Sequence, residues 1–188
     1  MKNNIMVDIE TLGTSAGSTI FQISAATFDI ETGEIGETID LKGDIAKMEI
    51  KADGSTIKWW LNTDKELLTK LLNEGTLSEV EMLEQFAEWI QKVESPKLWG
   101  NGILFDNAKI KSAMESKGIT YPIAYNRDLD VRTILFIASK ISGKTRDEIR
   151  NEVKDDSLVA HDALDDVVKQ INFVSHCYSI IENKQKEI

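Results

Sequence analysis

Two carboxylates two residues apart within an apolar run constrain this chain more than any other sequence feature. The run at residues 4–12 is typical of a β-strand, in which side chains alternate between the two faces of a sheet. Asp8 and Glu10 therefore share one face, and Val7 and Ile9 point to the other. Two ionised carboxylates this close repel each other, which raises the pKa of one of them unless a positive charge lies between them. A divalent metal would supply that charge, and the alternative is an exposed edge strand with two solvated acids.

The rest of the chain predicts an α/β domain. Strand-like runs at residues 20–28 and 37–41 follow the first strand across turn signals, which predicts a β-meander. Helical patterns and one short strand come next. A helical stretch begins at Ile57, a capping box at Thr63–Glu66 precedes a second helix, and a third helix follows Ser78. The short strand is expected at Lys97–Asn101, and the later helices at Asn107–Lys117, Ile134–Ile141, Thr145–Val153 and Ala160–Asn183. This order predicts a single domain, residues 1–188, with a central mixed β-sheet flanked by α-helices.

The charge of the chain limits the ways in which it can bind nucleic acid. A net charge of −10 argues against a protein that holds a duplex on a broad basic surface. An enzyme that acts on nucleic acid is still compatible with this charge, because metal ions and a few local lysine and arginine side chains can neutralise the substrate phosphates.

The sequence carries no signal for a membrane or for export. It has no run of about 18 apolar residues, and its N-terminus lacks a basic region followed by an apolar stretch and a cleavage site. The single cysteine, Cys177, cannot form an internal disulfide and fits a reducing compartment. We therefore expect a cytoplasmic protein with no membrane partner.

Asp106 is the second acidic candidate. It lies at the boundary between a glycine-containing strand end and a helix. Aspartate favours the N-cap position of a helix, which gives Asp106 a structural role. The ends of strands in α/β sheets are also the places where ligands bind, so the capping role and a ligand role can coexist.

His161 and the aspartates that follow it form the third candidate group. Asp166 lies one residue before Val167 and so flanks the apolar stripe of the last helix, whereas Asp165 points nearly opposite to that stripe. His161 is expected at the start of the helix, where the helix dipole favours a neutral imidazole that can act as a base.

Taken in order along the chain, these pieces resemble the DEDDh exonucleases, a group that includes proofreading exonuclease subunits, RNase T and oligoribonuclease. The resemblance rests on Asp-Ile-Glu-Thr at residues 8–11, on Phe105-Asp106, and on His161 with four residues between it and Asp166. It extends over nearly the whole chain and implies an RNase H-like fold.

Within that superfamily the chain is most similar to the branch of the T-even phage exonuclease A and the related bacterial 3′–5′ exoribonucleases, which suggests a phage or prophage setting. The features typical of that branch are Trp59-Trp60, Trp99-Gly100-Asn101-Gly102 and Asp130-Val131-Arg132-Thr133. The position of Asn101 departs from the proofreading type. In that type an asparagine lies two residues before the Phe-Asp pair, whereas here three residues separate Asn101 from Phe105.

The resemblance implies a metal-dependent 3′–5′ exonuclease that hydrolyses single-stranded DNA or RNA from the 3′ end to nucleoside 5′-monophosphates. Its cofactors would be two divalent ions, Mg²⁺ or Mn²⁺. By the family pattern, Asp8, Glu10 and Asp166 hold the first ion, and Asp8 and, directly or through water, Asp106 hold the second. His161 would deprotonate the attacking water as a general base. Relatives are often dimers, so the resemblance also suggests a homodimer.

Residues near the motifs are candidates for substrate contacts, and each has a structural alternative. Thr11, Leu12 and Gly13 follow the metal-binding strand, where they either contact the terminal nucleotide or form a plain turn. Trp59 and Trp60 are consecutive, so on a helix they point about 100° apart and cannot both be central to the core. We expect one of them to stack on a base or sugar, and packing of both in the core is the alternative.

A second group of substrate candidates surrounds Asp106 and the start of the following helix. Asn101 and Phe105 precede Asp106 in the motif and are expected to contact the substrate. Arg132 either meets a substrate phosphate or forms an ion pair with Asp128 or Asp130.

Two other functions compete with the nuclease hypothesis. A catalytically silent module of the same fold would bind nucleic acid or a partner without turnover, although every catalytic position carries the expected residue type. A phosphatase with Asp8 as nucleophile would leave His161 and Asp106 without roles.

Overall fold

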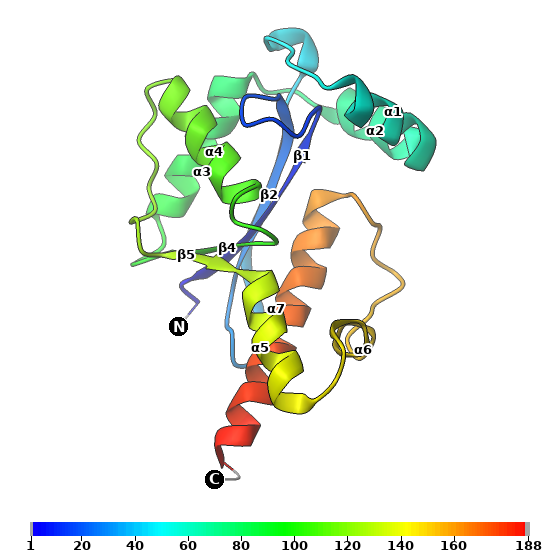
Figure 1. Ribbon diagram of the computed structural model, residues 1–188. Helices are drawn as coiled ribbons and strands as arrows, with labels where there is room; N and C mark the ends of the chain where they lie inside the picture. The colour runs from blue at the N-terminus through cyan, green and yellow to red at the C-terminus, as the bar shows by residue number, and fades with distance from the viewer. Residues whose placement is uncertain (1, 187–188) are drawn as a thin grey trace.

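The computed structural model describes residues 2–186, which form a mixed five-stranded sheet with helices on both faces (Figure 1). The strand order is β3-β2-β1-β4-β5. The strands are β1 (Asn4–Thr11), β2 (Ile20–Phe28), β3 (Ile35–Lys42), β4 (Lys97–Gly100) and β5 (Asp128–Asp130). The first three strands form an antiparallel meander, while β4 pairs parallel to β1 and β5 parallel to β4. The predicted meander and the mixed sheet are therefore confirmed.

The helices follow the predicted order with shifted ends. They are α1 (Gly54–Thr63), α2 (Lys65–Glu74), α3 (Glu79–Gln91), α4 (Asp106–Ser116), α5 (Val131–Ser142), α6 (Arg146–Asn151) and α7 (Ala163–Lys186), with a 3-10 turn, η1, at Ile45–Lys47. Ser78 and Glu81 form the predicted capping box of α3. The capping box expected at residues 63–66 was wrong: Thr63 ends α1, and Asp64 caps α2 by accepting a hydrogen bond from the Leu67 backbone N–H.

The alternation along β1 divides the core into two layers. Ile5, Val7 and Ile9 face α3 and α4, where they join a cluster that includes Phe86 and Ile110. On the opposite face, the cluster around Met6 takes its partners mainly from α5 and α7. Figure 1 shows α7 and α5 packed together against this second face. Asp8 and Glu10 lie on the face of Met6, so they point towards the helix that carries Asp166.

The start of α7 differs from the sequence prediction. The helix begins at Ala163 rather than Ala160, because Asp162 accepts a hydrogen bond from the Leu164 backbone N–H and terminates the preceding loop. His161 therefore lies before the helix. Its backbone is left-handed (φ +66°), a conformation that residues other than glycine seldom adopt. Within residues 2–186, no helix combines the length and apolar character needed to cross a membrane.

Candidate active site

A cavity of about 350 Å³ opens at the end of β1, and all five residues of the predicted catalytic set line it. The set consists of Asp8, Glu10, Asp106, His161 and Asp166. They come from three separate parts of the chain, namely β1, the start of α4, and the loop and first turn of α7. The fold thus brings together at one place the residues that the sequence motifs singled out.

The β1 carboxylates lie in a site that disfavours their charge. Burial raises the pKa of Asp8 well above its ordinary value, and the nearby carboxylates of Asp106 and Asp166 raise it further. Burial, together with the same neighbouring carboxylates and Asp8, raises the pKa of Glu10 to about 10. Removal from water and repulsion between like charges both favour the neutral acid, and together they outweigh the opposing charge of Lys169 at Asp8.

Asp106 is the first residue of α4 and not its N-cap, a position that Phe105 occupies. Its side chain is only 4% exposed. Burial raises the pKa of Asp106 to about 7, although hydrogen-bonding backbone groups of Ile9 and Asn101 and the charge of Arg132 oppose the rise. The structural alternative of a capping aspartate is therefore wrong, and the carboxylate is directed into the cavity lining.

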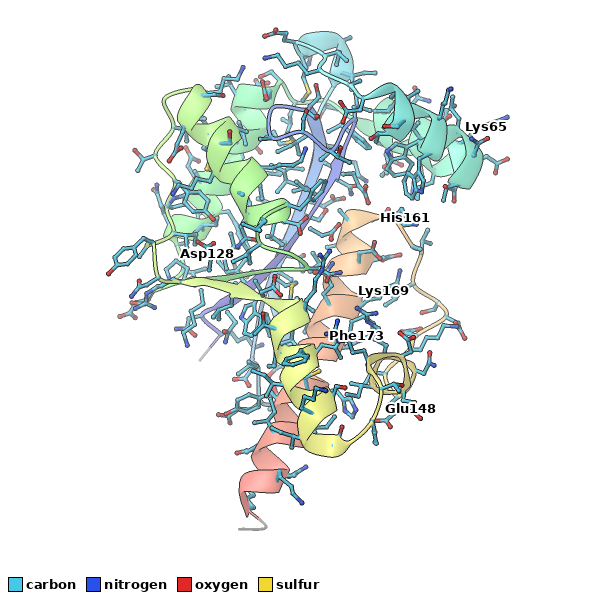
Figure 2. All side chains as sticks on the ribbon, viewed as in Figure 1. Lys65, Asp128, Glu148, His161, Lys169 and Phe173 are labelled. Carbon is cyan, nitrogen blue, oxygen red and sulfur yellow. The ribbon has the colours of Figure 1, made fainter. Side chains whose placement is uncertain are left out.

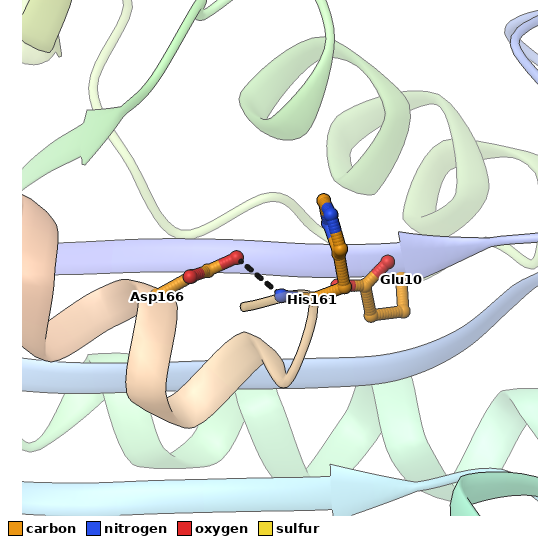
Figure 3. Close-up of side chains that lie close together, drawn as sticks. All are labelled: Glu10, His161 and Asp166. Carbon is orange, nitrogen blue, oxygen red and sulfur yellow. Dashed lines mark hydrogen bonds between the residues drawn. The ribbon is translucent and has the colours of Figure 1, made fainter. Parts of the chain in front are cut away.

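Glu10, His161 and Asp166 form the tightest group in the cavity. One potential ligand atom from each lies within 4.8 Å of the other two. The His161 backbone N–H donates a hydrogen bond of 3.1 Å to Oδ2 of Asp166, as Figure 3 shows. The dashed line in that view joins the loop to the first turn of α7, and the imidazole stands beside the Glu10 carboxylate. The left-handed backbone of His161 is thus stabilised by the same aspartate that completes the group.

The donor set fits a divalent cation. Four carboxylates and two cationic side chains, Arg132 and Lys169, line the cavity, which leaves an excess of two negative charges when all six groups are ionised. Carboxylate oxygens are the hard ligands that Mg²⁺ and Mn²⁺ prefer. A bound divalent ion would remove the repulsion that raises the carboxylate pKa values.

The tryptophan pair divides between the surface and the core. Trp60 is 1% exposed, its ring packs 5.8 Å from that of Phe21, and its indole N–H donates to the Thr11 carbonyl. Trp59 is 43% exposed, and its ring meets the His161 imidazole edge-on with centroids 4.9 Å apart. Of the two candidates for stacking on a base or sugar, Trp60 is enclosed in the core, and Trp59 is the tryptophan that lies beside the catalytic residues.

The residues of the turn after β1 are mostly buried and form hydrogen bonds with the surrounding backbone. Thr11 and Leu12 are 7% and 4% exposed. The Thr11 hydroxyl donates to the Gly13 carbonyl, and the Leu12 backbone pairs with Thr19 and Asp53. In this structure the three residues Thr11, Leu12 and Gly13 therefore support the end of β1, which was the structural alternative to a substrate contact.

Arg132 lines the cavity, and its guanidinium lies next to Gly102. Its guanidinium donates to Oδ1 of Asn101 at 3.4 Å and forms none of the predicted ion pairs with Asp128 or Asp130. A Cβ on Gly102, where φ is +113°, would lie 2.9 Å from the guanidinium carbon of Arg132. Asn101, Phe105 and Arg132 all line the cavity, so their side chains are available to a bound substrate.

A family model described as the 3′–5′ exoribonuclease Rv2179c-like domain matches residues 3–178. The chain belongs to this exoribonuclease family. It is therefore a 3′–5′ exonuclease, and its resemblance to the DEDDh group is confirmed. The phage branch stays a prediction, and no curated protein sequence matches the chain.

Solved structures similar to this exonuclease share its fold at low sequence identity. The nuclease domain of 3′hExo, a DEDDh family member bound to rAMP, has 12% identity and a TM-score of 0.63, with 94% of this chain and 91% of that chain covered. A zinc-bound complex of E. coli ExoI with single-stranded DNA has 16% identity and a TM-score of 0.66, with 98% of this chain and 42% of that chain covered. These similarities confirm the RNase H-like architecture.

The sequence motifs did not indicate three α7 residues that line the exonuclease site, Lys169, Gln170 and Phe173. Gln170 donates a hydrogen bond of 2.7 Å to Oδ1 of Asp8, and Lys169 lies 2.8 Å from Oδ1 of Asp166. Figure 2 shows Lys169 and Phe173 on the part of α7 that continues from His161 alongside α5. Helical spacing could have found Lys169 and Gln170, because residues three and four after Asp166 lie on its face of the helix.

Proposed function

We propose that this exonuclease removes nucleotides one at a time from the 3′ end of single-stranded RNA and releases nucleoside 5′-monophosphates. The observation that carries the proposal is the convergence of four carboxylates and His161 on one cavity. The family description, an exoribonuclease, supports RNA as the polymer. Residues 1–188 would together form one exonuclease domain.

Two divalent ions, Mg²⁺ or Mn²⁺, would be held by this donor set. Asp8, Glu10 and Asp166 would bind one ion, and Asp8 and Asp106 the other. Such ions, when bound, activate water and stabilise charge on the attacking and leaving oxygens of a phosphodiester. The excess of negative charge in the cavity and the raised pKa values of Asp8, Glu10 and Asp106 support this assignment.

His161 would accept the proton of the attacking water. Its backbone is fixed by the hydrogen bond to Asp166, and the Trp59 ring limits the movement of the imidazole on one side. General-base help of this kind is typically worth about 10²–10⁴ in rate. A ring nitrogen of His161 also lies within 4.8 Å of carboxylate oxygens of Glu10 and Asp166, so a role as metal ligand is the competing assignment.

Trp59, whose ring lies beside His161, and three residues that line the cavity would hold the polymer. Trp59 offers an exposed ring on which the terminal base can stack, and Arg132 offers a guanidinium to a phosphate. Asn101 and Phe105 line the same wall. The catalytic groups would then act on the phosphodiester that lies between the terminal nucleotide and the rest of the chain.

A single assay tests the activity and the polymer. Single-stranded RNA and DNA of equal sequence, labelled at the 5′ end, are incubated with the protein and Mg²⁺, Mn²⁺ or chelator. We expect a ladder that shortens from the 3′ end on RNA, and its loss with chelator and in Asp8→Ala. A faster ladder on DNA would reassign the polymer, and tight binding without cleavage of either polymer would favour the silent binding module.

A further inference from the structure

A row of cationic and aromatic side chains leads away from the active site along α5. Arg132 lines the cavity, and Phe136 and Lys140 follow it at intervals of four residues, so the three lie on one face of the helix. Arg146, the first residue of α6, joins the far end of the row. We call Arg132, Phe136, Lys140 and Arg146 the α5 row. The part on α5 spans about 12 Å along the helix axis.

The contacts within the α5 row keep an aromatic ring and two cations together at the surface. Phe136 is 45% exposed. The Lys140 ammonium lies 5.6 Å from the centre of the Phe136 ring, and the Arg146 guanidinium carbon also lies 5.6 Å from it. These distances are typical of cation–π contacts, which position the cations without using their hydrogen-bond donors.

The described cations of the α5 row form no ion pairs. Across residues 2–186, no carboxylate oxygen lies within the 4.0 Å of an ion pair from Arg132, Lys140 or Arg146. The acids nearest in sequence are engaged elsewhere, since Glu148 accepts hydrogen bonds from Thr145 and Asp147 lies 3.7 Å from Arg150. In a chain with a net charge of −10, Lys140 and Arg146 form a locally positive stretch outside the cavity. Arg132, whose charge also acts on the Asp106 carboxylate, joins that stretch to the active site.

We propose that the α5 row binds the part of a single-stranded nucleic acid that lies on the 5′ side of the terminal nucleotide. This inference rests on the proposed function. An exposed aromatic ring between cations is the combination that single strands use, because bases stack on the ring while the backbone phosphates meet the cations. Arg132 connects the row to the cavity, so one strand can occupy both.

The charge of the α5 row also argues against a second copy of the chain on this face. Ile137 and Ile141 lie beside the row and are 42% and 36% exposed, which gives the face some apolar area. A symmetric contact through the row would bring like charges from two copies together, which costs free energy unless acids face them. Phosphates neutralise these charges directly.

Substrates of different length distinguish the contribution of the α5 row to activity from that of the cavity. The variants are Phe136→Ala and the double variant Lys140→Ala/Arg146→Ala, with Lys92→Ala at the C-cap of α3 as the matched surface control. For RNA of about twelve nucleotides, a length typical of single-strand sites, we expect kcat/KM to fall about 10-fold in Phe136→Ala and in the double variant. Cleavage of a dinucleotide, and both activities of the control, should stay unchanged. An equal loss on both substrates would contradict the proposal.

Binding of the same RNA in chelator tests the α5 row without any cleavage. Each phosphate that the protein no longer neutralises should reduce the slope of log affinity against log salt by about 0.7, so the double variant should bind RNA with a slope smaller by about 1.4. An unchanged slope, or a shift in the sedimentation of the free protein that marks the row as a self-interface, would overturn the proposal. If wild type cleaves no RNA but the slope changes as expected, the proposed function fails while the α5 row stands.

Discussion

The side-chain amide of Gln170 donates a hydrogen bond of 2.7 Å to Oδ1 of Asp8, which joins α7 to β1 inside the site. Gln170 is 4% exposed, so water does not replace this donor. The hydrogen bond lowers the pKa of Asp8 against the larger effects of burial and neighbouring carboxylates. Gln170 therefore orients a carboxylate that both proposed ions share.

Replacing Gln170 by leucine should reduce activity with little change in fold. Hydrogen bonds to charged groups are worth about 1.5–3 kcal/mol, so we expect kcat/KM to fall by about 10- to 100-fold. The midpoint for activation by Mn²⁺ should rise in parallel, because Asp8 loses its orientation. Steady-state kinetics across a metal titration measures both, with Asn172→Leu on the same helix as the control. Wild-type kinetics in Gln170→Leu would remove the orienting role.

Metal should stabilise the protein more at higher pH. Because Glu10 and Asp106 have raised pKa values, of about 10 and about 7, the folded protein binds more protons than the unfolded chain above their ordinary values. The free energy of unfolding of the metal-free protein therefore decreases as pH rises from about 4.5. Asp106 contributes to this decrease up to about pH 7 and Glu10 up to about pH 10, and the raised pKa of Asp8 adds to it. Bound cations counter this loss once the carboxylates ionise.

Thermal unfolding at several pH values measures that linkage. In chelator, Tm should fall between about pH 5 and pH 8, and Mn²⁺ should raise Tm by several degrees more at the higher pH, since about 1 kcal/mol corresponds to 2–4 °C in a domain of this size. Asp8→Asn removes one of the repelling charges, so it should raise Tm in chelator and shrink the metal effect. A metal effect independent of pH would contradict the linkage.

The variant His161→Ala should show whether His161 acts as a general base or as a metal ligand. If His161 accepts the proton of the attacking water, kcat should fall by about 10²–10⁴ while Mn²⁺ affinity, measured by calorimetry, changes little. His161→Gln serves as a control that keeps a polar side chain next to Trp59. A loss of metal affinity as large as the loss of kcat would assign His161 to the metal, and an unchanged kcat would remove it from the mechanism.

The two tryptophans should give opposite results. Trp59→Ala removes an exposed ring beside His161, so we expect KM for RNA to rise by about 10-fold, in line with about 1–3 kcal/mol for stacking on a base, with Tm nearly constant. Trp60→Ala opens a cavity in the core and should cost about 3–5 kcal/mol of stability. Leu61→Ala, also exposed on α1, controls for surface change. If Trp59→Ala lowers Tm as much as Trp60→Ala, the division between surface and core is wrong.

The sequence predicted the parts of the site that depend on local periodicity. Strand alternation alone places Asp8 and Glu10 on one face, and helical spacing places Asp166 beside the apolar stripe of α7. The three-residue strand β5 was missed because it is too short to display alternation. Consecutive tryptophans indicated that one ring lies outside the core, but the packing of α1 against Phe21 decides that it is Trp59.

Contacts that do not follow strand or helix periodicity account for what the sequence could not predict. The left-handed backbone of His161 depends on the hydrogen bond to Asp166, and nothing in the residue type indicates it. The pairing of Gln170 with Asp8 joins residues 162 positions apart and depends on how α7 crosses the sheet. The loop before α7 is held by Val159 contacts with Asp165 and Lys169, which helix patterns do not report.

Release of a 3′-terminal label measures directly whether the carboxylates of this cavity support 3′–5′ cleavage. Single-stranded RNA labelled on its last nucleotide is incubated with Mn²⁺ and either wild type or Asp166→Asn, which keeps the shape of the side chain and removes its charge. We expect wild type to release the label first as a nucleoside 5′-monophosphate, and Asp166→Asn to release it at least about 10²-fold more slowly. Label that leaves wild type in longer fragments, or equal release by both proteins, would contradict a carboxylate-dependent 3′–5′ exonuclease at this site.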